Sequence, residues 1–111
     1  MKIALIQQSV GCDREENIEC AIEAMRSAAD AGATMVCFAE LSIDRFFPQC
    51  KNDPQAAGIA EPIPGPTSDR IGAQSAELGL VTIFNQYELG PDKCYYDSSP
   101  VFDADGALLG V

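Results

Sequence analysis

The sequence contains no histidine and few basic residues, and these shortages exclude whole classes of function. Seventeen acidic residues against seven basic ones give a formal net charge of −10. Such a chain repels the phosphates of nucleic acids and the head groups of anionic lipids. No apolar run reaches the roughly 18 to 20 residues of a membrane span, and the first one ends at Gln7, short of a signal-peptide core. We therefore expect a cytoplasmic protein without nucleic-acid or membrane partners.

Motifs for metals, disulfides and nucleotides are also missing. The five cysteines are odd in number and widely spaced, never form Cys-x-x-Cys, and have no histidine to complete a zinc site with them. No Gly-x-Gly-x-x-Gly or Gly-Lys-Ser/Thr loop follows an early strand, which argues against a nucleotide-binding domain. We expect reduced thiols, no metal and no cofactor.

The remaining composition fits one small α/β domain, because 111 residues with 47% hydrophobic side chains suffice for an ordinary core. Asp13 is an N-cap acid before apolar residues at helical spacing, and Thr67 or Ser68 can cap a second such stretch. These patterns predict helices over residues 14–31 and 68–78. Apolar runs predict strands over residues 2–7, 34–39, 80–87, 95–102 and 107–111.

The order β-α-β-α-β-β-β predicts a mixed sheet with both helices on one face. The strand over residues 34–39 is continuously apolar, as in strands that are covered on both faces. The last strand, over residues 107–111, has no polar closing segment and looks like a cut through a domain. We expect a second sheet or a partner chain on the open face, and a homo-oligomer overall.

One acidic residue stands at the end of a predicted buried strand, in the stretch CFAELSIDRFFP. Glu40 directly follows residues 34–39, and α/β sheets place ligands beyond the carboxyl ends of their strands. Burial there would raise its pKa and suit it to general-base catalysis. The alternative is that Glu40 caps the loop or pairs with Arg45. The proline-rich loop that follows, residues 41–66, is expected to be packed and functional.

Three features in this order resemble the nitrilase superfamily of carbon-nitrogen hydrolases. They are the glutamate after the second strand, Pro-Gly-Pro before the second helix, and the turn Phe-Asp-x-Asp-Gly. The resemblance runs the whole length of the chain and implies the N-terminal part of a nitrilase-like α-β-β-α sandwich. Residues 1–111 would then form an incomplete carbon-nitrogen hydrolase domain. Within the family, ELSIDRFFP looks most like the N-carbamoyl amino acid amidohydrolases, which cleave a ureido group.

The resemblance implies a triad of glutamate, lysine and cysteine. The glutamate deprotonates the thiol, the thiolate attacks a carbonyl or nitrile carbon, and the lysine stabilises the resulting charge. It assigns Glu40 as the general base and Glu88 as a supporting acid; alternatively, Glu88 is a solvated residue at a hairpin entrance. Both acids would end strands at one edge of a sheet, so we expect Glu88 to approach a partly buried Glu40.

In the family the lysine and the cysteine lie beyond the segment that these 111 residues match. Cys37 is excluded as the nucleophile, because a residue three positions before Glu40 on a strand points to the opposite face. Lys93 belongs to a turn and is expected to be solvated. The chain departs from the family with Ala39 in place of proline and Asp97 in place of asparagine, and neither departure is expected to touch the triad position.

Two functions are compatible with these features. The first is the N-terminal portion of a thiol-dependent carbon-nitrogen hydrolase of amidase or carbamoylase type, acting on a small amide, ureido or nitrile substrate. The second is a non-catalytic half-sandwich that serves as a binding or scaffold module. The 111 residues by themselves are expected to be inactive and to self-associate.

Overall fold

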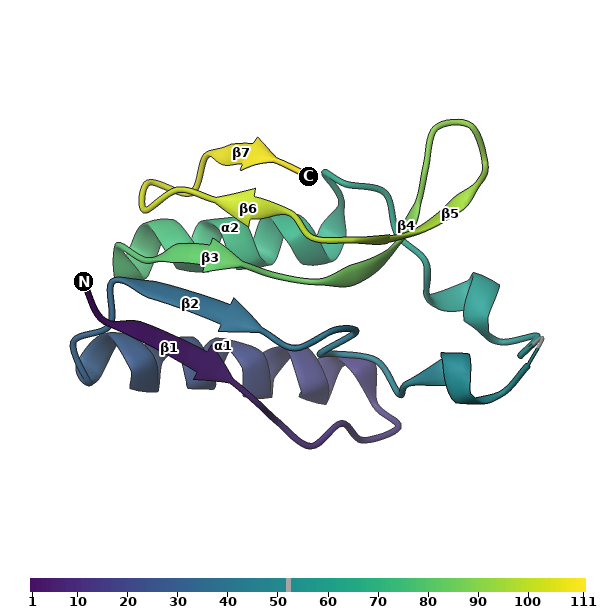
Figure 1. Cartoon of the computed structure of the whole chain (residues 1–111), viewed down its shortest axis with the longest axis horizontal. Coiled ribbons are helices and arrows are strands. Elements are labelled where there is room, and N and C mark those ends of the chain that lie inside the picture. Colours follow the sequence, from purple (N-terminus) through teal and green to yellow (C-terminus); the bar gives the residue numbers. More distant parts are fainter. Residues whose placement is uncertain (52) are drawn as a thin grey trace.

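The computed structural model describes residues 1–51 and 53–111 and shows an α/β fold (Figure 1). The α-helices are α1 (Arg14–Asp30) and α2 (Pro66–Leu78), and short 3-10 helices cover Phe47–Gln49 and Ala56–Ile59. The strands are β1 (Ile3–Ile6), β2 (Met35–Phe38), β3 (Val81–Ile83), β4 (Gln86–Leu89), β5 (Tyr95–Ser98), β6 (Val101–Phe102) and β7 (Leu108–Gly110).

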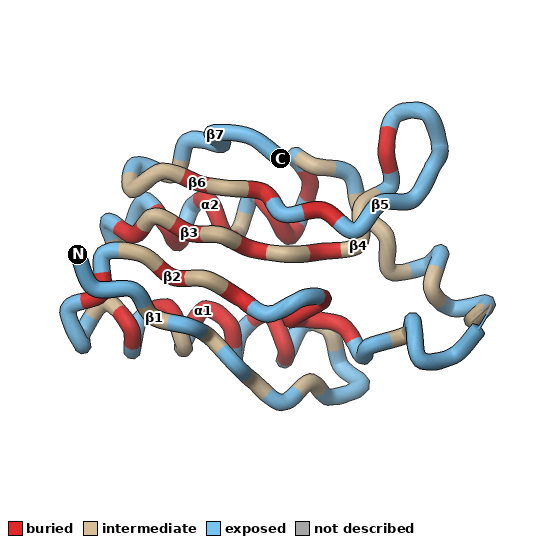
Figure 2. The backbone as a smooth tube through the Cα atoms, in the orientation of Figure 1, coloured by how far each residue is buried: buried red, intermediate tan, exposed pale blue. Residues whose placement is uncertain are grey.

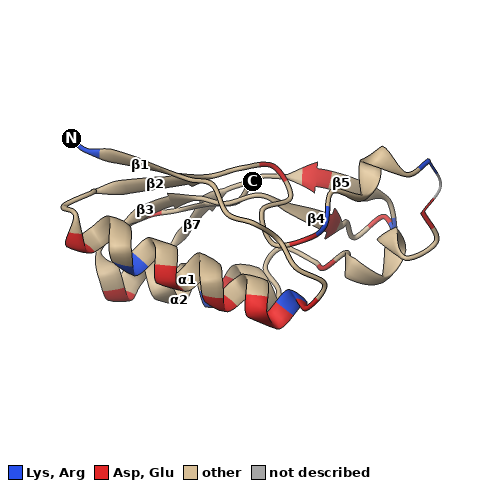
Figure 3. Cartoon of the chain, turned by 90° about the horizontal axis from the view of Figure 1, so that it is seen from below, with Lys and Arg blue, Asp and Glu red and all other residues tan. Residues whose placement is uncertain are grey.

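Five strands form a mixed sheet in the order β1-β2-β3-β6-β7, and β4 pairs with β5 in a separate hairpin. β1, β2 and β3 are parallel, while β6 and β7 are antiparallel additions at the edge. Parallel neighbours need a crossover, and α1 and α2 supply the two crossovers. Seen from the side, both helices lie under the same face of the sheet (Figure 3). The predicted fold class is therefore confirmed.

Two predicted strands are each broken in the structure. Residues 80–87 divide into β3 and β4, and residues 95–102 divide into β5 and β6. The breaks lie opposite each other, where the Phe84 N–H donates to the Pro100 carbonyl at 3.1 Å. The chain bends there from the main sheet into the hairpin, a change of sheet that local apolar patterning does not encode.

The second helix begins two residues earlier than predicted, at Pro66. Proline is well suited to a first helical position, because its missing N–H would have no partner there and its φ is already helical. Gly65, and neither Thr67 nor Ser68, is the N-cap residue, and the Ser68 hydroxyl accepts the Gly65 N–H at 2.8 Å. Gly79 ends the helix in the left-handed conformation, with φ of 63°.

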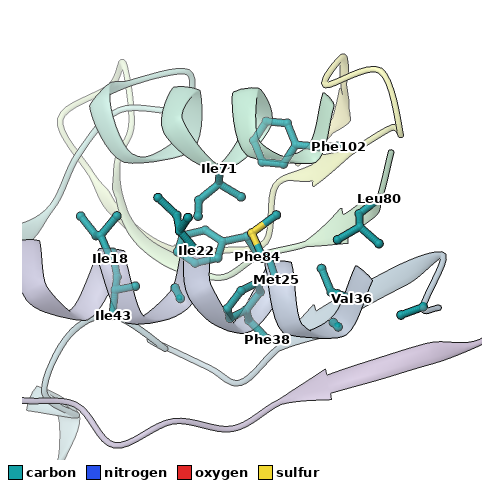
Figure 4. Packing of buried hydrophobic residues seen from close by; sticks show 13 residues of the cluster. Ile18, Ile22, Met25, Val36, Phe38, Ile43, Ile71, Leu80, Phe84 and Phe102 are labelled. Carbon is teal, nitrogen blue, oxygen red and sulfur yellow. The ribbon is translucent and has the colours of Figure 1, made fainter. Parts of the chain in front are cut away.

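The core lies between the helices and the covered face of the sheet (Figure 4). Phe84 is fully buried at its centre and meets Phe38 edge to face, with ring centroids 5.2 Å apart. Met25 from α1 and Ile71 from α2 are also fully buried. The helices are thus held to the sheet by large apolar side chains from both layers.

The other face of the sheet is apolar and has no covering layer within the described residues. Ile3 and Leu5 on β1 are 48% and 80% exposed. In register with them, Met35 lies beside Ile3 and Cys37 beside Leu5. Along the edges, β1 and β7 are largely exposed (Figure 2). The exposure of Ile3 and Leu5 agrees with the expectation of an open face, as far as the described residues go.

We expect the 111-residue chain to self-associate through this open face, and Leu5→Gln combined with Ile3→Gln to shift it towards monomer. Withdrawing a large aliphatic side chain from water is worth about 1.5–3 kcal/mol, and both side chains remain in water in the single chain. Light scattering over a concentration series measures the shift. Leu89→Gln, which alters an exposed leucine on the hairpin, is the control. A monomeric wild-type chain at all concentrations would contradict the expectation.

Candidate functional site

Glu40 lies just beyond the carboxyl end of β2, at the start of a turn. It lines a cavity of about 260 Å³ with neighbours that include Gln8, Asp44 and Arg45. The expectation of a partly buried carboxyl group is wrong, because Glu40 is exposed. Burial was inferred from the apolar strand before it, but β2 ends at Phe38 and the turn carries Glu40 out of the packed layer.

Asp97 on β5 is close enough to Glu40 to act on the ionisation of its carboxyl group. A hydrogen bond with Asp97 raises the pKa of Glu40, and local desolvation and the Asp97 charge raise it further. The expectation that position 97 does not touch the triad position is therefore wrong. The two residues are 57 positions apart in sequence, and Asp97 lies on the second strand of the β4–β5 hairpin.

Asn85, between β3 and β4, is hydrogen-bonded both to Leu41, which follows Glu40, and to Asp97. Its side-chain oxygen accepts the N–H of Leu41 at 2.6 Å, and its amide nitrogen donates to Asp97 Oδ1 at 2.8 Å. The same nitrogen donates to the Ser99 hydroxyl at 3.1 Å. The Asn85 side chain thus connects the turn that carries Glu40 to β5.

Glu88 follows Asp97's partner Tyr87 on β4, and Glu88 and Asp97 both line a second cavity. In the β4–β5 ladder Tyr87 lies opposite Asp97 and Glu88 lies opposite Tyr96, so Asp97 and Glu88 project from opposite faces of the hairpin. The Ser98 hydroxyl donates to the Glu88 carboxylate. Asp97, and not Glu88, is the acid that the structure brings to Glu40; a supporting role for Glu88 stays a prediction.

A cluster around Arg14 anchors the loop that follows Glu40. The guanidinium group donates to Asp44 at 2.9 Å and also to Glu61 and Thr67. Burial raises the pKa of Asp44, and Arg14 only partly offsets this effect. The cluster joins the start of α1, the loop and the start of α2. It therefore fixes both ends of the long loop next to the cavity.

Glu61→Gln is expected to destabilise the chain by about 1.5–3 kcal/mol at neutral pH, the range for hydrogen bonds to a charged group. Burial opposes ionisation of Glu61, but hydrogen bonds from the Thr67 N–H and from Arg14 outweigh it and lower the Glu61 pKa. The stabilisation is therefore present above the unfolded pKa of about 4.3. It disappears as the pH falls through the lower folded value.

Urea unfolding at several pH values measures this effect. Glu77→Gln, at an exposed position on α2, is the control and should change stability little at any pH. A destabilisation by Glu61→Gln that persists unchanged at the acid end would show that the carboxylate charge is not what stabilises the loop.

Neither Lys93 nor any of the five cysteines lines the cavity next to Glu40. Cys12, Cys20, Cys50 and Cys94 are exposed free thiols and Cys37 is half-buried. Strand alternation stops at Phe38 and does not extend to the turn, so it does not place Cys37 on the opposite face from Glu40, contrary to the expectation. Lys93 is exposed, as expected. Among the described residues, no three histidine, cysteine or acidic side chains converge as metal ligands.

The family model for carbon-nitrogen hydrolases matches residues 2–111. The chain belongs to the carbon-nitrogen hydrolase family. It is 30% identical over 110 residues to the N-carbamoylputrescine amidase of Solanum lycopersicum, covering 98% of this chain and 36% of that protein. It is 28% identical over 112 residues to omega-amidase NIT2 of Xenopus tropicalis, covering 97% of this chain and 37% of that protein. The carbon-nitrogen hydrolase chain thus spans just over a third of the length of these relatives.

Solved structures share the fold of this carbon-nitrogen hydrolase chain. A carbon-nitrogen hydrolase from Helicobacter pylori G27 superposes with a TM-score of 0.87 at 21% identity, covering 97% of this chain and 37% of that one. An amidase from Nesterenkonia sp. AN1 in complex with acrylamide gives a TM-score of 0.74 at 16% identity, with 99% and 41% covered. None of the helices in the described part of the chain is long and apolar enough to span a membrane.

Sequence reasoning overlooked Asn85 and treated Asp97 only as a departure from the family pattern. The charge at position 97 is visible in the sequence, but a separation of 57 residues from Glu40 gives no sign that the two interact. Asn85 gives no signal either. It lies inside a stretch that reads as one continuous strand, and its role depends on the break in that strand.

Proposed function

We propose that residues 1–111 supply the general base of a thiol-dependent carbon-nitrogen hydrolase of amidase or carbamoylase type, with Glu40 as that base. The observation that carries the proposal is the position of Glu40. It stands beyond the carboxyl end of β2 and lines a cavity, in a chain that matches the family over residues 2–111. Ligands of α/β sheets bind at such strand ends.

The chemistry needs a base that is ionised near neutral pH but holds a proton more tightly than an ordinary glutamate. Asp97 raises the pKa of Glu40 in that direction. Glu40 would take the proton of a cysteine thiol, and the thiolate would add to the substrate carbonyl carbon. Cleavage of the carbon-nitrogen bond then releases the amine, with the proton from Glu40, and leaves a thioester that water hydrolyses. The lysine and cysteine that the family resemblance implies would come from outside these residues, and Glu88 would support them.

The substrate is proposed to be a small amide or a ureido compound. An omega-amidase and an N-carbamoylputrescine amidase are both among the relatives, and these names correspond to the two substrate classes. The chemistry at the attacked carbon is the same for both, because each is a carbonyl carbon bonded to nitrogen.

The protein encoded by the complete reading frame that contains residues 1–111 provides the test. We expect it to release ammonia from a short-chain amide or from an N-carbamoyl amine, and we expect a thiol-alkylating reagent to abolish the release. The 111-residue chain assayed alongside should be inactive. Turnover by the 111 residues that Cys37→Ala abolishes would overturn the assignment of the nucleophile.

A half-sandwich module without catalytic activity is the alternative. The exposed apolar face of the sheet is compatible with it, since a binding module would also use that face. A reading frame that ends at Val111, with a purified product that is monomeric and inactive, would support this alternative over the hydrolase.

A further inference from the structure

The backbone directly after Glu40 adopts an unusual conformation. Leu41 has a φ of 48°, in the left-handed region that residues with a side chain seldom enter, and its side chain is only 3% exposed. This conformation costs roughly 1–2 kcal/mol for a residue other than glycine. Such a residue persists only where surrounding contacts hold it. The Leu41 N–H is held by Asn85 Oδ1 at 2.6 Å.

The opposite end of the Asn85 side chain holds Asp97. A backbone N–H requires an acceptor and a carboxylate requires a donor, so the orientation of the Asn85 amide follows from its partners. An aspartate at position 85 would accept from Leu41 but repel Asp97, and a serine is too short to reach both. A carboxamide has both an acceptor for the Leu41 N–H and a donor for the Asp97 carboxylate.

The charged groups around Glu40 come from two elements. Asp97 reaches it from β5, and Asp44 and Arg45, from the loop after β2, line the same cavity. Glu88 projects from the other face of the hairpin. Asp44 is engaged by Arg14, and Asp97 is the charged group that acts on the ionisation of Glu40. Among the described residues, Asp97 is therefore the charged neighbour to change when testing what sets the ionisation of Glu40.

We propose that Asn85 is a positioning residue of the site: its side-chain oxygen fixes the turn that presents Glu40, and its amide nitrogen holds Asp97 against the Glu40 carboxyl group. Asp97 held in this position keeps the pKa of Glu40 raised. The catalytic meaning of this arrangement rests on the proposed function, in which Glu40 is the general base. The hydrogen bonds of Asn85 to Leu41 and Asp97 do not depend on that function.

The test follows the titration of the Glu40 carboxyl carbon by NMR in the 111-residue chain with labelled glutamate. Asp97→Asn should lower the pKa of Glu40, because the neighbouring negative charge is gone. Asn85→Ala should lower it nearly as far, although Asn85 is not one of the groups that act on Glu40, because Asp97 is released. The double variant should show no further fall, since both changes remove the same interaction.

Hydrogen exchange of the Leu41 amide is the second measurement. Asn85→Ala should speed exchange on the order of tenfold, as expected for the loss of one hydrogen bond, and Asp97→Asn should leave it nearly unchanged. Ser99→Ala is the matched control, because it removes the 3.1 Å contact of Asn85 but neither of the other two. It should alter neither the titration nor the exchange.

A Glu40 titration that is identical in the wild type and in Asn85→Ala would overturn the proposal, as would an unchanged Leu41 exchange rate. If Asn85→Ala unfolds the chain, Asn85→Asp decides the matter. That variant keeps the acceptor for Leu41 and adds a charge, so exchange should stay slow while Asp97 is displaced and the Glu40 titration changes. No substrate is used in these measurements, so an inactive enzyme would count against the proposed function without affecting this result.

Discussion

Glu40→Gln in the protein from the complete reading frame is expected to lower kcat/KM by roughly 10²–10⁴-fold, the usual contribution of a general base. Glutamine has nearly the same shape and still forms hydrogen bonds, but it does not take up the thiol proton. Because Glu40 is exposed in this chain, the substitution should leave the folded chain intact. Steady-state hydrolysis of an amide and of an N-carbamoyl amine measures the loss.

The pH dependence of the same enzyme distinguishes a base from a residue that only binds substrate. A base must be deprotonated, so kcat/KM should fall as the pH drops through the Glu40 pKa, which Asp97 raises. Asp97→Asn should therefore move this fall in kcat/KM to lower pH. Glu88→Gln should lower kcat/KM by a smaller factor without changing the pH at which it falls, and Glu77→Gln should have no effect. Full activity in Glu40→Gln would exclude Glu40 as the base.

Phe84→Ala is expected to destabilise the chain by about 3–5 kcal/mol, the range for removing a large buried aromatic side chain. The ring is fully buried and packs edge to face against Phe38, at the point where the main sheet passes into the hairpin. Small domains have only about 5–15 kcal/mol of stability in total. Much of the chain should therefore be unfolded at temperatures where the wild type is folded.

Thermal unfolding followed by far-ultraviolet circular dichroism measures this change. Phe46→Ala is the matched control, because it removes the same side chain from a position that is 46% exposed. It should lower the melting temperature far less. Equal effects of the two substitutions would mean that Phe84 is not central to the core.

The candidate site was only partly predictable from the sequence. Glu40 was found because an acid at the end of an apolar strand is a local pattern, and its strand and position are as expected. Its exposure and its contact with Asp97 were not expected. Both depend on which segment lies beside the end of β2, and a local pattern contains no information on that neighbour.

Helical spacing, caps and crossover connections are local or near-local properties, so the sequence alone predicts both helices, the apolar runs and a mixed sheet. The tertiary structure sets where the long apolar runs break. It also decided that Asn85 joins Leu41 to Asp97, across 44 and 12 residues of chain. These contacts depend on the register between distant strands, which is selected by the packing of the whole sheet against its helices.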